Sequence, residues 1–356
     1  MSLVTLLTRR LAPRSSPVPF RCRYHMSQLA SSSPSASAVH AQLASLQGQN
    51  FLSTMDLNTA QLTGLLSKAQ ELKRTCSGPD KASAPKPLTG ESCSMLFQKR
   101  STRTRLSSET GMYLLGGKGI FLSSEDIQLG VNETLKDTAH VLSRFNSLIL
   151  ARVYAHKDIH ELAQLASVPV INALSDKFHP LQMLADYLTV HEHFGKIEGL
   201  TFAWVGDGNN VLHDYMLAAP KLGANIQIAT PKGYEPDQDV VDETKRLAAL
   251  AGTTVVMTTD PVEAVKGANV VATDTWISMG QEEEAKKRLA AFAGYQITNK
   301  MLEHAATDHV FLHCLPRHQD EVDDEVFYGP RSLVFDEAEN RLWTVMAVFS
   351  SLLGKF

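Results

Sequence analysis

Short apolar segments alternate with longer stretches of helical periodicity along most of this chain of 356 residues. Between the segments, apolar residues recur at spacings of three and four, as in a helix that packs one face against a core. Because strand–helix–strand alternation favours parallel pairing, the pattern predicts an α/β protein with parallel sheets. The predicted strands are Ser92–Phe97, Ile120–Ser123, Ser147–Val153, Val168–Ala173, Leu200–Val205, Asn225–Thr230, Thr253–Thr259, Ala268–Thr273 and His309–Cys314.

The alternation is interrupted once, by the longer helical run Pro180–Phe194. We interpret this run as a connector, which predicts two doubly wound domains joined by interdomain helices. A further helical run, Glu337–Leu353, has a large apolar face to bury. The predicted division is a leader and linker over residues 1–45, a first domain over 46–185, a second domain over 186–335, and a C-terminal helix over 336–356 that packs back on the first domain.

The N-terminal segment differs in composition from the rest of the chain. No acidic residue precedes Asp56, whereas five arginines and many serines do. This composition is typical of a mitochondrial transit peptide, and its apolar residues precede the arginine pair, the reverse of a secretory signal. A disordered tail without a targeting role is the alternative. Without those arginines the chain has 29 basic and 38 acidic residues, which excludes a strongly basic nucleic-acid binder.

The four cysteines include no C-x-x-C pair. A zinc ribbon and a disulfide framework are therefore not expected, and no metal site is predicted. No run of about 18 apolar residues is present, so stable insertion in a membrane is not expected either.

The segment Phe97–Arg105 (FQKRSTRTR) lies between a predicted strand and a predicted helix. Hydroxyl and backbone N–H groups therefore gather at a helix N-terminus, which attracts anions. The arginine forks add charge and match the geometry of a phosphate group. The segment lacks the glycines of a P-loop. It predicts a phosphate site, and the alternative is a solvated basic helix start.

Two further motifs open predicted helices. In His179-Pro180-Leu181-Gln182 the proline fixes the helix start, so His179 and Gln182 can face one site. The segment Gly206–Val211 (GDGNNV) imitates a dinucleotide fingerprint, but it has valine at the third glycine position. The next predicted strand also has no acidic residue to hold a ribose at its end. A nicotinamide-dependent dehydrogenase therefore remains only an alternative.

Three more motifs follow predicted strands or open the last helix. They are Asp274–Gly280 (DTWISMG), His313–Arg317 (HCLPR) and Glu339–Arg341 (ENR). Ligands of open α/β sheets bind outside the carboxyl ends of the strands, which makes the first two candidates for binding. Since neighbours in a strand point to opposite faces, a dyad of His313 and Cys314 is not predicted.

Together these motifs resemble the ornithine carbamoyltransferase family, along with ARVY at Ala151–Tyr154. They occur in the order found in that family and spread from about residue 50 to the end. The resemblance implies a carbamoyl-phosphate domain followed by an ornithine domain, no cofactor, and a homotrimer with sites between subunits. It implies transfer of a carbamoyl group to L-ornithine in the mitochondrial matrix, for the urea cycle or arginine synthesis, giving L-citrulline and phosphate.

The resemblance also implies roles for individual residues. Those implied to act in catalysis are Arg103, Arg152, His179, Asp274 and Cys314. Those implied to bind carbamoyl phosphate are Ser101, Thr102, Arg103, Thr104, Arg152, His179, Gln182, Cys314, Leu315, Arg341 and Lys118. Lys118 stands where the family often has histidine or glutamine, donated by the neighbouring subunit. Those implied to bind ornithine are Asn210, Asp274, Ser278 and Met279.

The implied chemistry fits these residue types. Carbamoyl phosphate is already activated, so no covalent intermediate is needed and Cys314 is interpreted as a site-lining residue. Donors such as Arg152, His179 and Thr104 would stabilise the charge that develops on the carbonyl oxygen. The carboxylate of Asp274 suits the cationic side chain of ornithine.

Positive charge must then be local in an acidic protein. We expect the cationic side chains of Lys99, Arg100, Arg103, Arg105, Arg152 and Arg341 to converge on one cleft. A binding protein without activity would lack some of the expected positions, but all are filled. Putrescine and an N-acylated ornithine remain alternative acceptors.

Overall fold

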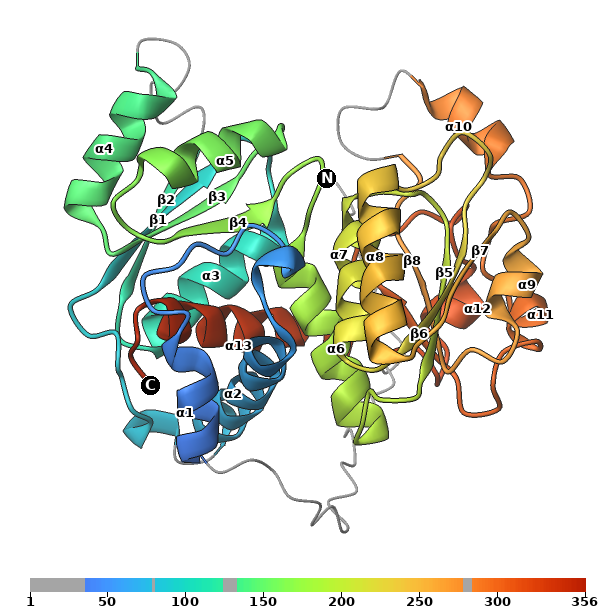
Figure 1. The fold of residues 1–356 in the computed structure, drawn as a ribbon, viewed down its shortest axis with the longest axis horizontal. Helices are drawn as coiled ribbons and strands as arrows, with labels where there is room; N and C mark the ends of the chain where they lie inside the picture. Colours follow the sequence, from blue (N-terminus) through green and yellow to red (C-terminus); the bar gives the residue numbers. More distant parts are fainter. Residues whose placement is uncertain (1–35, 79–80, 124–132, 278–283) are drawn as a thin grey trace, which may run out of the picture. The chain divides into compact units, whose positions relative to one another are not determined.

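The computed structural model describes residues 36–78, 81–123, 133–277 and 284–356. Two parallel sheets lie in this part of the chain, each with helices on its faces (Figure 1). The first contains β1 (Ser92–Phe97), β2 (Lys118–Ser123), β3 (Leu148–Arg152) and β4 (Val170–Leu174). The second contains β5 (Thr201–Val205), β6 (Asn225–Ala229), β7 (Val255–Thr258), β8 (Val270–Thr273) and β9 (Val310–His313).

The helices follow the predicted alternation. Their bounds are α1 (Ala36–Ala44), α2 (Thr59–Ser77), α3 (Thr102–Leu114), α4 (Leu135–Phe145), α5 (His156–Leu165), α6 (Pro180–Phe194), α7 (Asn210–Lys221), α8 (Gln238–Ala251), α9 (Pro261–Val265), α10 (Ala285–Ala291), α11 (Asn299–Leu302), α12 (Asp324–Phe327) and α13 (Val334–Leu352). The predicted α/β fold with two parallel, doubly wound sheets is confirmed. None of the described helices is long and apolar enough to cross a membrane.

The strand orders place the motifs. They are β2-β1-β3-β4 and β7-β6-β5-β8-β9, so the winding reverses between β1 and β3 and again between β5 and β8. In open parallel sheets, ligands bind at such switch points, outside the carboxyl ends of the strands. The segment Lys99–Arg105 follows β1 and Arg152 ends β3, whereas Gly206–Asn210 follows β5 and Asp274 follows β8. Each sheet therefore carries polar motifs at its switch point.

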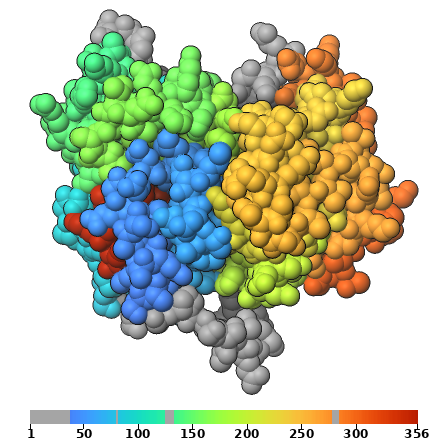
Figure 2. All heavy atoms as spheres, in the orientation of Figure 1, coloured from blue at the N-terminus to red at the C-terminus, as the bar shows by residue number. Residues whose placement is uncertain are grey.

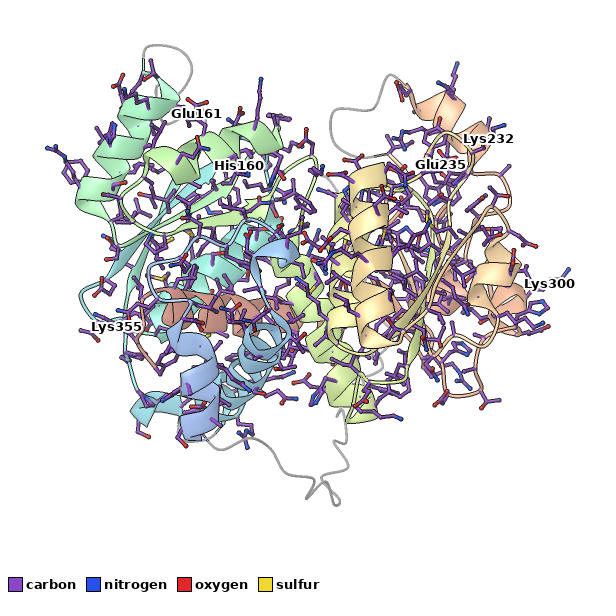
Figure 3. All side chains as sticks on the ribbon, in the orientation of Figure 1. His160, Glu161, Lys232, Glu235, Lys300 and Lys355 are labelled. Carbon is purple, nitrogen blue, oxygen red and sulfur yellow. The ribbon has the colours of Figure 1, made fainter. Side chains whose placement is uncertain are left out.

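Two helices connect the sheets. α6 is buried from Pro180 to Val190 and contacts α2, α7, α13 and β4, so it is a connector as predicted. The predicted boundary between residues 185 and 186 falls inside it. α13 packs against α2, α3 and α6 (Figure 1). It also contacts β9. The residues after α13 are tied to the first sheet, because Lys355, labelled in Figure 3, pairs with Glu91 just before β1.

A buried polar contact joins Thr54, which precedes α2, to α7. Asp214 is fully buried and accepts hydrogen bonds from the backbone N–H and hydroxyl of Thr54, at 2.7 and 2.6 Å. Its other oxygen accepts the backbone N–H of His179 at 2.6 Å. Asp214 therefore caps α6, whose own N-cap side chain makes no capping bond. In Figure 2 the blue surface of the first part of the described chain meets the yellow surface of the second sheet's helices.

Candidate active site

A cavity of about 670 Å³ collects the motifs from both switch points. Residues of α3, β3, β4, α6, α7, α10 and α13, and of the segments that follow β1, β8 and β9, form its walls. The predicted site residues that line it are Ser101, Thr102, Arg103, Thr104, Arg152, His179, Gln182, Asn210, Asp274, Cys314, Leu315 and Arg341. Residues far apart in the sequence are therefore brought to one place by the fold, as the motif reading predicted.

One wall is the N-terminus of α3. Ser101 caps this helix, since its hydroxyl accepts the backbone N–H of Thr104 at 3.3 Å. The first N–H groups of the helix carry a partial positive charge and suit an anion. The Arg103 side chain starts from this turn and donates to the backbone oxygen of Leu315, which follows β9. Arg103 thus links the start of α3 to the segment that follows β9 of the second sheet.

Cationic side chains are crowded in the same part of the cavity. Arg152 and Arg341 are 6% and 2% exposed. Burial and then the positive charge of Arg103 lower the pKa of each guanidinium to about 10. Burial, followed by the charge of Arg152, lowers the pKa of Lys99. A dianion such as phosphate would relieve this repulsion, so the charge distribution points to an anionic ligand.

His179 lies beside this cluster and is 5% exposed. Burial and the charges of Arg341, Arg152 and Arg103 lower its pKa well below the usual value, so the imidazole is neutral at pH 7. Its Nε2 faces Nη1 of Arg341 at 3.5 Å, which leaves the proton to Nδ1. Nδ1 has no hydrogen-bond partner in the described part of the chain. This nitrogen is therefore available to donate to a ligand.

Gln182 is held in one orientation. Its side-chain oxygen accepts from Nη1 of Arg341 at 2.6 Å, and its nitrogen donates to Asp186 and Glu337 at 2.7 Å each. Arg341 also donates to the hydroxyl of Thr104 at 3.3 Å. Sequence reasoning missed the two carboxylates. The spacing of four residues between Gln182 and Asp186 on α6, and between Glu337 and Arg341 on α13, is the signal that would have revealed them.

The second sheet contributes an acidic wall. Asp274 is 5% exposed and accepts from the Cys314 thiol at 2.8 Å and from the Asn209 amide at 2.9 Å. Burial and the neighbouring Asp274 raise the pKa of the Cys314 thiol well above its usual value. Cys314 is therefore a neutral donor to Asp274, in agreement with its interpretation as a site-lining residue. Asn209 was not predicted to contact Asp274.

The histidine beside Cys314 has other partners. His313 Nε2 lies 2.9 Å from Glu321, and its Nδ1 accepts the backbone N–H of Leu315 at 2.9 Å. Among the described residues, His313 and Cys314 therefore form no dyad, as the alternation of strand side chains predicted. The amide of Asn210 donates to the backbone oxygen of Ser175 at 2.5 Å.

Four predicted residues lie elsewhere. Lys118 is exposed at the first position of β2, paired with Ser92 at the opposite end of the sheet from the cavity. Arg105 was expected in the cleft, but it turns away on α3, pairs with Glu109 and stacks over the ring of Phe121. That expectation was wrong because position 105 faces outward on the helix. Ser278 and Met279 lie outside the described residues.

The glycines after β5 serve the protein's own backbone. A Cβ atom on Gly208 would lie 2.3 Å from backbone atoms of Glu235 and Pro236. The N–H of Gly208 also donates to the backbone oxygen of Tyr234 at 2.9 Å. The opposing backbone atoms, from Tyr234 to Pro236, lie in the loop that follows β6. Glu235 of this loop is labelled in Figure 3. The close approach that a dinucleotide's phosphates would need is thus taken by the chain itself, which disfavours the dehydrogenase alternative.

Gly208→Ala is expected to destabilise the protein by roughly 1–3 kcal/mol or more, because the loop has to move away from the new methyl group. The free energy of unfolding in urea measures this loss. Gly78→Ala is the matched control, since Gly78 lies after α2 and its Cβ would meet only one atom, at 3.3 Å. Equal stability of the two variants would show that the loop yields without cost.

Sequence comparison with known families agrees with this geometry. Residues 49–192 match the family described as aspartate/ornithine carbamoyltransferase, carbamoyl-P binding domain. Residues 198–352 match the aspartate/ornithine carbamoyltransferase, Asp/Orn binding domain. The chain belongs to the aspartate/ornithine carbamoyltransferase family. The first match ends inside α6 and the second begins just after it, so that Arg103 and Arg152 lie in the first match and Asp274 and Arg341 lie in the second.

Individual members of the family are close relatives. The chain is 56% identical over 311 residues to the mitochondrial ornithine transcarbamylase of Gallus gallus, covering 87% of each chain. It is 54% identical to the mitochondrial ornithine carbamoyltransferase of Aquarana catesbeiana, over 87% of this chain and 88% of that one. The solved ornithine carbamoyltransferase from Pyrococcus furiosus superposes with a TM-score of 0.83 at 45% identity, over 87% of this chain and 99% of that one.

Proposed function

We propose that this protein transfers the carbamoyl group of carbamoyl phosphate to the side-chain amine of L-ornithine, giving L-citrulline and phosphate. The proposal rests on the distribution of positive and negative side chains around the cavity. Arg103, Arg152 and Arg341 line the wall that α3, β3 and α13 provide, and Asp274 lines the wall that the second sheet provides. One wall suits a dianionic phosphate and the other a cationic amine, so the two substrates would meet in between.

The reaction needs donors around the carbamoyl oxygen. Attack by the amine places negative charge on this oxygen, and fixed donors lower the barrier. Nδ1 of His179 and Nε of Arg152 are buried and have no partner among the described residues, so both can supply such donors. The phosphate would bind Arg103, Arg341 and the N-terminal turn of α3 through Ser101, Thr102 and Thr104. These groups would also stabilise the leaving phosphate.

The second substrate would bind at the other wall. Asp274 would hold the cationic side chain of ornithine, with Cys314 and Asn210 nearby. Ser278 and Met279 would hold the amino-acid head group, as the family resemblance implies. Gln182 would accept from the carbamoyl NH2 group and Leu315 would contact it.

The rate is expected to rise with pH between 6 and 9. The attacking amine must be unprotonated, and an alkylamine of this kind has a pKa of about 10.4. Burial also raises the pKa of Asp274, so the carboxylate that binds the amine forms over rising pH. His179 stays neutral over this range because its pKa is lowered. A flat pH–rate profile at saturating substrates would contradict the requirement for an unprotonated amine.

A citrulline assay tests the proposed acceptor directly. Carbamoyl phosphate is incubated with ornithine, putrescine or N-acetylornithine in parallel. We expect ornithine to be used far better than the other two. Preferred use of putrescine would exclude a role for the head-group contacts, and no turnover with any acceptor would reject carbamoyl transfer.

The oligomeric state, the cellular location and the pathway proposed here are those that the family resemblance implies. We propose a homotrimer in the mitochondrial matrix, with residues 1–45 as transit peptide and linker, and a role in the urea cycle or arginine synthesis. The mitochondrial relatives and the acid-free N-terminal sequence support this location. Exposure of Lys118, away from its own cavity, supports a role toward a neighbouring subunit. The division into domains at residues 46–185, 186–335 and 336–356 also stays a proposal.

A further inference from the structure

Two carboxylic side chains lie buried behind the phosphate end of the cavity. Asp186 on α6 is 3% exposed and Glu337 on α13 is 1% exposed. Neither lines the cavity itself, so neither would contact carbamoyl phosphate. The residue between them and the cavity is Gln182. The role that we assign to their protonation rests on the function proposed above.

The two carboxyl groups are held close together. The same nitrogen of Gln182 donates to Oδ1 of Asp186 and to Oε1 of Glu337, at 2.7 Å each. Two ionised carboxylates that share one donor nitrogen repel each other strongly in a buried setting. Burial and the neighbouring Glu337 raise the pKa of Asp186, and burial raises the pKa of Glu337. The pair therefore retains a proton at neutral pH.

The hydrogen bonds indicate which residue carries it. Glu337 accepts an N–H on each oxygen: Gln182 donates to Oε1, and the backbone of His313 donates to Oε2 at 2.9 Å. The bond that Asp186 accepts from Gln182 is on Oδ1, so Oδ2 is the atom that can hold a proton. We propose that Asp186 is a neutral acid that donates to an ionised Glu337, and that the pair with its single negative charge fixes the Gln182 amide for carbamoyl phosphate.

The direction of the amide follows from this arrangement. Acceptors face the Gln182 nitrogen, and the donor Nη1 of Arg341 faces its oxygen. A carboxamide can be placed either way round, but only this orientation satisfies all three partners. The oxygen is then directed to the cavity side, where the NH2 group of the carbamoyl donor needs an acceptor. Asp186 and Glu337 are thus positioning residues.

The number of charges also matters. The single negative charge of the pair lies close to Arg341, because Gln182 bonds both to Glu337 and to Arg341. One negative charge neutralises part of the guanidinium cluster of Arg103, Arg152 and Arg341. Most of the cluster's positive charge then remains to attract the phosphate. A second negative charge here would reduce the attraction for a dianion. The bond from His313 to Glu337 further ties the end of β9 to α13, next to Cys314.

Two isosteric variants test the proposal. Asp186→Asn replaces the neutral acid by a neutral amide of the same shape, which can still donate to Glu337. Glu337→Gln removes the negative charge and places an amide donor against either the Gln182 nitrogen or the backbone N–H of His313, both of which donate to Glu337 in the wild type. Glu339→Gln, an exposed position on the same helix, is the matched control for loss of one carboxylate. The probe is phosphonoacetamide, a stable analogue of carbamoyl phosphate, bound without ornithine and followed by calorimetry.

We expect Glu337→Gln to weaken binding of the probe by about 10- to 100-fold, the usual effect of losing hydrogen bonds to a charged group. Asp186→Asn should change binding by less than about threefold, and Glu339→Gln should not change it. Equal losses in Asp186→Asn and Glu337→Gln, or no loss in either, would overturn the proposal. If the wild type failed to bind the probe, the proposed function itself would fail.

A spectroscopic measurement covers the case in which Glu337→Gln does not fold. The infrared spectrum of the wild type should contain the carbonyl stretch of a buried neutral carboxylic acid. This band should be absent from Asp186→Asn, whose thermal midpoint confirms that it is folded. A wild-type spectrum in which Asp186→Asn removes only carboxylate bands would show that Asp186 is ionised and would overturn the proposal.

Discussion

Arg103→Ala should lower kcat/KM for carbamoyl phosphate by about 1000-fold. A single fixed donor to a developing negative charge is worth about 10²–10³ in rate, and an arginine fork supplies two such bonds together with a full charge. Arg103 also bridges the N-terminus of α3 and the backbone oxygen of Leu315. Its loss therefore removes both a ligand for phosphate and a link between α3 and the segment that follows β9. Steady-state citrulline formation measures the effect.

The same variant should fold at least as well as the wild type. Arg103 lowers the pKa of Arg152 and of Arg341, so its charge destabilises both buried guanidinium groups in the free protein. Calorimetry should show an unchanged or raised thermal midpoint, and the midpoint should no longer rise on addition of phosphonoacetamide. Arg144→Ala, an exposed position on α4, is the control and should keep full activity. Less than tenfold loss in Arg103→Ala would remove Arg103 from the proposed mechanism.

The fold could be predicted closely because its signals are local. Apolar runs such as Leu148–Arg152 are buried on both faces of a parallel sheet, which gives them a composition that no amphipathic helix has. β2 begins two residues earlier than predicted, at Lys118, because pairing with β1 extends it beyond its apolar core. Helix starts were marked by Ser101 and Pro180, whose preferences for such positions are strong.

The site could be predicted only in part, because its remaining contacts join distant segments. The cap on α6 comes from Asp214, 35 residues further along the chain. The partners of Gln182 include Glu337, 155 residues away. The spacing of four residues between Glu337 and Arg341 is a local signal for one of these carboxylates, but it does not identify the distant partner, Gln182. Arg105 was placed wrongly for a related reason: a run of basic residues does not reveal which of them faces the cavity.

Asp274→Asn should lower kcat/KM for ornithine by about 100-fold and change the affinity for carbamoyl phosphate little. A hydrogen bond to a charged group contributes about 1.5–3 kcal/mol, which is about 10- to 150-fold in binding. The amide would also place a donor against either the Cys314 thiol or the Asn209 amide, both of which donate to Asp274 in the wild type. The ornithine amine would then lose both its charge partner and its alignment.

Cys314→Ser separates this explanation from covalent catalysis. A serine hydroxyl can donate to Asp274 as the thiol does, so the variant should lose less than about tenfold in kcat/KM for ornithine, well below the loss in Asp274→Asn. The raised pKa of the Cys314 thiol leads to the same expectation, because a thiol that stays protonated is a poor nucleophile. Abolition of activity in Cys314→Ser, with Asp274→Asn nearly unaffected, would reverse the assignment. If kcat/KM for ornithine falls further in Asp274→Asn than in Cys314→Ser, the carboxylate acts on the amine through its charge and the thiol only positions that carboxylate.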